Sequence, residues 1–60
     1  MICEIEIGAV YELEGYGMVR VFNFHRYKNN EYVYFQPLNS CDSSFISVEE
    51  FFKLVSMKYD

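Results

Sequence analysis

Residues 19–38 read VRVFNFHRYKNNEYVYFQPL, and this stretch decides the fold. Two runs rich in aromatic and β-branched residues flank the polar tetrapeptide KNNE at 28–31. Such residues favour strands, and Asn tolerates the left-handed backbone angles of tight turns. We therefore expect a β-hairpin with a long strand over 18–27, a link at 28–31 and a partner strand over 32–36.

The two strands of this hairpin differ in how their side chains alternate. In the partner strand, Tyr32 and Tyr34 share one face with Gln36, and Val33 and Phe35 occupy the other. Pro37 cannot donate to a ladder and marks the strand's end. The long strand mixes apolar and polar residues on both faces, which predicts that it curves between two environments, as in small barrels.

The remaining segments also read mainly as strands. Residues 3–7 alternate apolar and acidic, which predicts a half-buried strand with Cys3, Ile5 and Ile7 inside. A short strand over 10–13, a glycine turn at 14–17, a loop over 39–44 and a short strand at 45–46 follow. We expect one mainly β domain over residues 1–60, a curled antiparallel sheet with a C-terminal helix.

The expected helix covers about residues 47–58. Ser47 and Glu50 form a capping box, in which the Ser hydroxyl accepts from an amide three residues later and Glu50 reaches back. The apolar residues that follow have helical spacing and should pack on the sheet as one stripe. These residues are Val48, Phe51, Phe52, Val55 and Tyr59.

The short length of 60 residues limits the core, because such a chain buries only about 60% of its unfolded surface. Two cysteines, Cys3 and Cys41, and a single histidine offer no metal site. Residues 1–10 show no secretion signal, so we expect both thiols to be reduced, buried small hydrophobes in a cytoplasmic protein. The additional stability that a small core needs should come from the six Tyr and six Phe and from assembly into a homo-oligomer.

The net charge of −4 is spread unevenly. Every basic residue among the first fifty lies inside residues 19–38, and residues 16–30 contain no carboxylate. Long nucleic acid is a poor partner for an otherwise acidic surface, because such binding needs several cations along a backbone. No apolar run reaches the twenty or so residues of a membrane span. A small anion still suits the basic segment.

The order of motifs resembles the small SH3-like barrel proteins of unknown function found in bacteria and phages. The residues that carry the resemblance lie between about 8 and 52: GAVY at 8–11, His25 with Glu31, YFQPL at 34–38 and FISVEEF at 45–51. The resemblance implies a small SH3-like β-barrel and makes a phage-encoded modulator of host defence a plausible setting. It brings no catalytic residues.

Two catalytic arrangements can be drawn from the sequence. Cys41 and Asp42 with His25 could act as nucleophile, orienter and base, and His25 with Glu31 could serve as an acid–base pair for a phosphodiester. A reactive thiol needs an electropositive pocket, whereas Cys41 stands beside an aspartate in a serine-rich loop. We therefore expect no enzyme, no catalytic residue, no metal and no cofactor.

Binding is better supported than catalysis for residues 19–38, and three readings of the segment stay open, two of them binding and one purely structural. Tyrosine rings could stack a base while cations hold phosphate, so that the protein sequesters a small nucleotide-like anion. Alternatively, a host protein could dock on the exposed aromatic β-face, with the chain acting as inhibitor or adaptor. Ordinary cross-strand packing, with cations protecting an edge, is the third. The candidate ligand-binding residues are Arg20, His25, Arg26, Tyr27, Lys28, Tyr32 and Tyr34.

Overall fold

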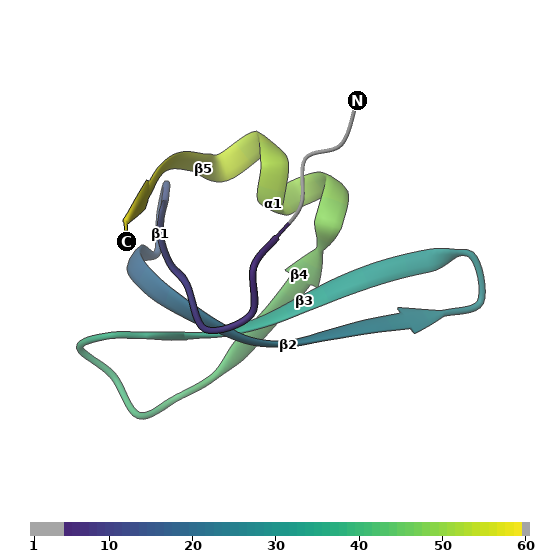
Figure 1. The fold of residues 1–60 in the computed structure, drawn as a ribbon, viewed down its shortest axis with the longest axis horizontal. Helices are drawn as coiled ribbons and strands as arrows, with labels where there is room; N and C mark the ends of the chain where they lie inside the picture. The colour runs from purple at the N-terminus through teal and green to yellow at the C-terminus, as the bar shows by residue number, and fades with distance from the viewer. Residues whose placement is uncertain (1–4, 60) are drawn as a thin grey trace.

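The computed structural model describes residues 5–59 as one antiparallel sheet with a short helix (Figure 1). The strands follow one another in the sheet in the order β4-β3-β2-β1-β5. The elements are β1 (Val10–Leu13), β2 (Gly17–Tyr27), β3 (Asn30–Pro37), β4 (Ser44–Ser47), α1 (Val48–Leu54) and β5 (Val55–Tyr59). The mainly β prediction and the central hairpin are confirmed.

The sheet is not closed into a barrel, which corrects that part of the expected fold. Strands β4 and β5 are the two edges of the sheet, and the described residues include no ladder between them. Helix α1 follows β4 directly and leads into β5, so it carries the chain from one edge to the other. The helix thus spans the gap that a barrel would close with hydrogen bonds (Figure 1).

The core lies between the sheet and α1, is small, and combines aliphatic with aromatic side chains. Val19 and Val21 of β2 and Val33 and Phe35 of β3 are fully buried on one face of the sheet, which we call the core-side face. Phe51 of α1 covers this face. The remaining core residues are Tyr11 and Leu13, and the Tyr11 ring meets Phe51 edge-on with 5.1 Å between ring centroids. The inward alternation predicted for β3 is confirmed.

The predicted helix is right at its start and wrong at its end. The Ser47 hydroxyl accepts from the Glu50 amide at 3.1 Å, as the capping box predicts. The helix stops at Leu54, and Val55 opens strand β5, which pairs with β1. Residues four apart share a face in a helix and also in a strand, so the spacing of Val55 and Tyr59 fits both. Pairing with β1 selects the strand.

The N-terminal strand predicted over residues 3–7 is also wrong where it can be judged. Cys3 lies outside the described residues, and residues 5–7 form no strand. The Ala9 amide donates to the Glu6 carbonyl, and Gly8 has a φ of 93°, so the chain turns here. Ile5 packs against the core as expected, whereas Ile7 is exposed.

The hairpin link is shorter than predicted. Strand β3 begins at Asn30, so only Lys28 and Asn29 connect it to β2. The left-handed angle falls on Lys28, with a φ of 58°, and not on an asparagine.

The 39–44 segment is a loop up to Ser43, as predicted. Its Cys41 is an exposed free thiol, so the prediction of a buried cysteine at this position is wrong.

Candidate functional site on the central hairpin

A β-bulge determines which residues of β2 face which way. Val21 pairs with Phe35, and the next pair joins Asn23 to Tyr34, so Phe22 is one residue more than β3 can match. A bulge residue reverses the alternation that follows it. Consequently Val19 and Val21 face the core before the bulge, and Phe24 faces that side after it, opposite Val33. The mixed faces of β2 in the sequence have this cause.

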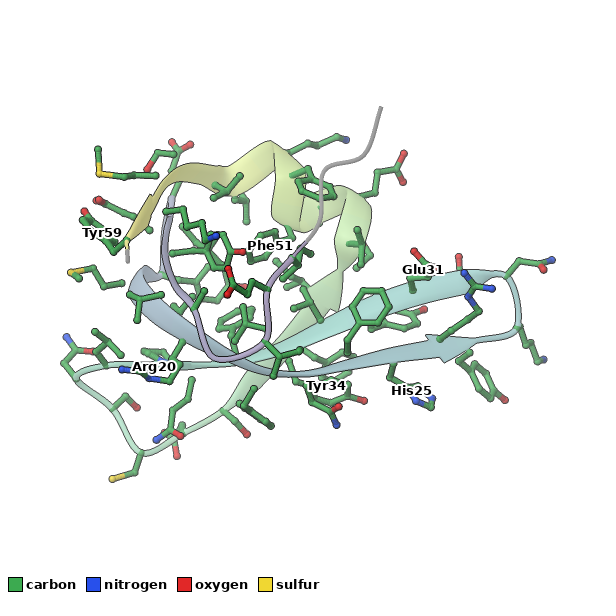
Figure 2. All side chains as sticks on the ribbon, in the orientation of Figure 1. Arg20, His25, Glu31, Tyr34, Phe51 and Tyr59 are labelled. Atoms are coloured by element: carbon green, nitrogen blue, oxygen red, sulfur yellow. The ribbon has the colours of Figure 1, made fainter. Side chains whose placement is uncertain are left out.

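The bulge also separates the two arginines of β2. Arg20 pairs with Gln36 on the outer face, opposite to the core, whereas Arg26 pairs with Glu31 on the core-side face. Figure 2 shows Glu31 on one side of the hairpin and His25 and Tyr34 on the other. The two arginines therefore cannot grip one ligand from the same face of the sheet.

The outer face of the hairpin carries two neighbouring groups of aromatic rings. Tyr34 stacks on Phe45 of β4 with 5.2 Å between centroids and a 29° interplanar angle, and Tyr32 meets the same Phe45 edge-on at 6.0 Å. Phe22 lies 6.3 Å from Tyr34. We call this surface the aromatic face; it consists of Phe22, His25, Tyr27, Tyr32, Tyr34 and Phe45.

The far end of the aromatic face lies near the hairpin turn. The His25 ring lies 6.5 Å from the Tyr27 ring with an interplanar angle of 19°, so the two rings are nearly parallel. The Lys28 ammonium lies 5.5 Å from the Tyr27 centroid, a cation–π arrangement. Tyr27 is 58% exposed and Phe45 is 57% exposed, so both ends of the face are open to solvent.

Each Arg and Lys side chain of the hairpin already contacts a different group of the protein. The Arg26 guanidinium binds Glu31 through two nitrogens, with an Nε to Oε2 distance of 3.1 Å. The Arg20 Nη1 donates to the Gly8 carbonyl at 2.8 Å. Lys28 lies over Tyr27. The cations point in three directions and do not converge on one anion site.

Arg20 lines an open depression at the other end of the molecule from His25 (Figure 2). The depression has a volume of about 450 Å³ and lies between the turn at Gly8, β2 and β5. Lys58 donates to Glu6 in its wall at 2.7 Å, and this hydrogen bond lowers the pKa of the Glu6 carboxyl. Tyr59, also in the wall, donates to Glu12 at 2.8 Å, and this bond raises the pKa of the Tyr59 hydroxyl.

The structure thus divides the seven predicted ligand-binding residues into groups. His25, Tyr27, Tyr32 and Tyr34 lie together on the outer face, with Lys28 at the turn beside Tyr27. Arg26 lies on the core-side face and Arg20 in the separate depression. Sequence reasoning missed Phe22 and Phe45. Phe45 could have been found, because pairing the predicted strand at 45–46 with 32–36 brings it to the exposed tyrosines.

One of the catalytic arrangements drawn from the sequence, His25 with Glu31, is not assembled. His25 pairs with Tyr32 and Glu31 pairs with Arg26, so the histidine and the carboxylate lie on opposite faces of the hairpin. Among residues 5–59, no three His, Cys, Asp or Glu side chains gather in a way that could hold a metal ion. The helix of the described chain is too short to cross a membrane.

Comparisons of the chain with protein-family models, with curated proteins and with solved structures find no match. The function of the chain is therefore inferred from the geometry of its own hairpin.

Proposed function

We propose that this chain is a non-catalytic binding module that docks a partner protein on the aromatic face of its central hairpin. The observation that carries the proposal is the set of mutually packed rings left open to solvent on this face. Its activity would consist of occupying the partner, as an inhibitor or adaptor does.

The packing of the rings favours affinity. Tyr and Trp dominate the energetic centres of protein interfaces, where each large ring removes much apolar surface from water. Tyr32 and Tyr34 are half-buried against Phe45 before any partner arrives. Little side-chain freedom then remains to be lost on binding, so more of the contact energy is available as affinity.

Self-association is part of the same proposal. Residues with large apolar side chains are exposed over much of the described surface, and a 60-residue core is marginal alone. We propose a homo-oligomer at micromolar concentration. Sedimentation of the purified chain tests this directly, and a stable 7.2 kDa species at every concentration would refute it.

Sequestration of a small nucleotide-like anion is the second candidate function, and the depression beside Arg20 favours it. Its volume falls in the range of small-molecule sites, and the wall holds an arginine and a tyrosine. We also propose an SH3-like fold, which the five antiparallel strands and the helix before the last strand support, and a phage-type modulator as its setting. Either candidate would act in the cytoplasm.

The test of the first candidate compares matched surface variants. Phe45→Ser and Tyr34→Ser change the aromatic face, whereas Leu38→Ser changes an exposed apolar residue of the 38–43 loop. Immobilised parent and variants are exposed to proteins of the source cell, and bound proteins are quantified. A partner of the aromatic face is retained by Leu38→Ser and lost with both other variants. Equal retention by all proteins would refute the proposal.

The second candidate is tested by thermal shift with linear and cyclic nucleotides at low and moderate salt, on the parent and on Arg20→Gln. A nucleotide-induced rise in melting temperature that disappears in Arg20→Gln would favour it. The absence of any shift would remove it.

A further inference from the structure

Strand β2 has a neighbour on both sides only along its first half. Strand β1 pairs with β2 from Gly17 to Arg20, and next to it Val21 exchanges main-chain hydrogen bonds with Gly8 (2.7 Å) and Ala9 (3.1 Å). At Gly8 the chain turns away. Within residues 5–59, no strand pairs with this side of β2 beyond Val21. We call the unpaired side of residues 23–27 the distal edge (Figure 1).

The distal edge presents main-chain groups for pairing. The Phe24 amide donates to the Asn23 side-chain oxygen at 2.8 Å, so it faces away from β3. In an antiparallel ladder, residues alternate in the side to which their N–H and C=O point. The N–H and C=O of Arg26 therefore face the same way as those of Phe24. A strand laid along this edge would find two donors and two acceptors in register.

The side chains beside this edge select the chemistry of such a strand. Of the cationic residues in 16–30, a stretch with no carboxylate, Arg26 lies beside this edge and Lys28 follows at the turn. Arg26 and Phe24 flank the edge on the core-side face, with the Arg26 side chain 70% exposed in spite of its bond to Glu31. A second copy of the same edge would bring like charges together, which is unfavourable. An acidic strand would bring opposite ones.

We propose that the distal edge accepts an extended acidic segment of a partner protein as an additional strand of the sheet. A carboxylate of that segment lies beside Arg26, and an apolar side chain two residues along lies beside Phe24. The inference rests on the proposed protein-binding function and names its mode: main-chain pairing at the edge, next to ring contacts on the aromatic face. Asn23 competes with the segment for the Phe24 amide.

The probe is a pair of capped hexapeptides, Thr-Glu-Thr-Val-Thr-Glu and Thr-Lys-Thr-Val-Thr-Lys, titrated to millimolar concentration into ¹⁵N-labelled protein. In each peptide the charged residue and the Val two positions along share one face of the strand, as the proposal requires. The acidic peptide is expected to shift the Phe24 and Arg26 amide signals and to slow their hydrogen exchange, and moderate salt should weaken this binding. The basic peptide should have no effect. Absence of binding by the acidic peptide, or equal binding by both, would overturn the inference.

Two variants of the edge make opposite predictions. Phe24→Pro removes the outward N–H while the ladder with β3 stays intact, and should weaken acidic-peptide binding at least about tenfold. Asn23→Ala frees the same N–H and should strengthen binding about threefold or more. Unchanged affinity in Asn23→Ala would overturn the inference even if Phe24→Pro failed to fold.

Two further readings separate this inference from its alternatives. Concentration-dependent protection of the Phe24 and Arg26 amides in the absence of peptide would mean that a second copy occupies the edge, which would overturn it. Tyr34→Ser should reduce capture of the whole partner but leave hexapeptide binding within about twofold, since the peptide needs only the edge. Peptide binding by Tyr34→Ser tests the edge proposal, and partner capture by the same variant tests the proposed function. The failure of one proposal can therefore be told from the failure of the other.

Discussion

Helix α1 contributes one fully buried side chain, Phe51, to the core. Truncating Phe51 and the adjacent Phe52 in turn should show how much more a buried ring stabilises the fold than an exposed one. Phe51 is 1% exposed and packs edge-on against Tyr11, whereas Phe52 is 40% exposed. Truncation of a fully buried Phe to Ala costs about 3–5 kcal/mol, because contacts are lost and a cavity remains. A domain of this size has a total stability of about 3–9 kcal/mol. Phe51→Ala should thus remove at least about a third of the stability, and all of it if the total lies at the low end of this range.

Phe52→Ala is the matched control, since it deletes the same atoms from the same helix. Only part of its surface is buried, so the expected cost is about 1–2 kcal/mol. Urea unfolding followed by circular dichroism measures both values. For a small domain with an m-value of about 1 kcal/mol/M, the two midpoints should differ by about 1–4 M. Equal midpoints, or a larger loss in Phe52→Ala, would refute the assignment of Phe51 as the residue that joins helix and sheet.

Other variants test local features of the fold. Ser47→Ala removes the cap on the Glu50 amide and should cost about 0.5–2 kcal/mol in thermal unfolding; no loss would mean that the cap is not formed in solution. Lys28→Gly relieves the left-handed angle at 58° and should stabilise the hairpin by up to about 1 kcal/mol in urea, whereas a loss would contradict that angle. The pKa of Glu6 is lowered in the folded state, so its bond to Lys58 gives stability that is present above the unfolded pKa and lost as pH falls through the folded pKa. The free energy of unfolding should therefore fall less steeply with pH below about pH 4 in Glu6→Gln than in the parent. The same pH dependence in both proteins would exclude this role. The pKa of Tyr59 is raised in the folded state, so the stability it gives is lost as pH rises past about 10. The free energy of unfolding should therefore fall less with pH above this value in Tyr59→Phe than in the parent. The same fall in both proteins would argue against the bond from Tyr59 to Glu12.

Features set by neighbouring residues could be predicted from the sequence. The β2–β3 hairpin, the inward Val33 and Phe35 and the cap at Ser47 all depend on local alternation, turn chemistry or a side chain three residues away. Each of these predictions is confirmed. Four of the predicted ligand-binding residues also lie on one surface, because alternation in β3 and in β2 beyond the bulge fixes their direction.

Features set by distant partners could not be predicted in this way. Strand β5 forms because β1 offers it an edge, and a helical spacing in the sequence cannot reveal that competition. The bulge at Phe22 is the second case: alternation shows that β2 has mixed faces but does not say where the additional residue is inserted. That single insertion moves Arg26 to the face opposite Arg20. The shared cation site expected from the sequence is therefore not formed.

The helical connection between the two edges of the sheet also affects how the chain folds. The β2–β3 hairpin joins residues close in sequence, and hairpins form within about 1–10 μs. The β1–β5 ladder pairs Val10 with Tyr59, and closing the long loop between these two residues costs chain entropy before any contact is gained. Such non-local pairing slows folding. Strand β5 and Phe51 should therefore be added late to a sheet nucleated at the hairpin, and the part of the aromatic face that lies on β2 and β3 would form before the core is sealed.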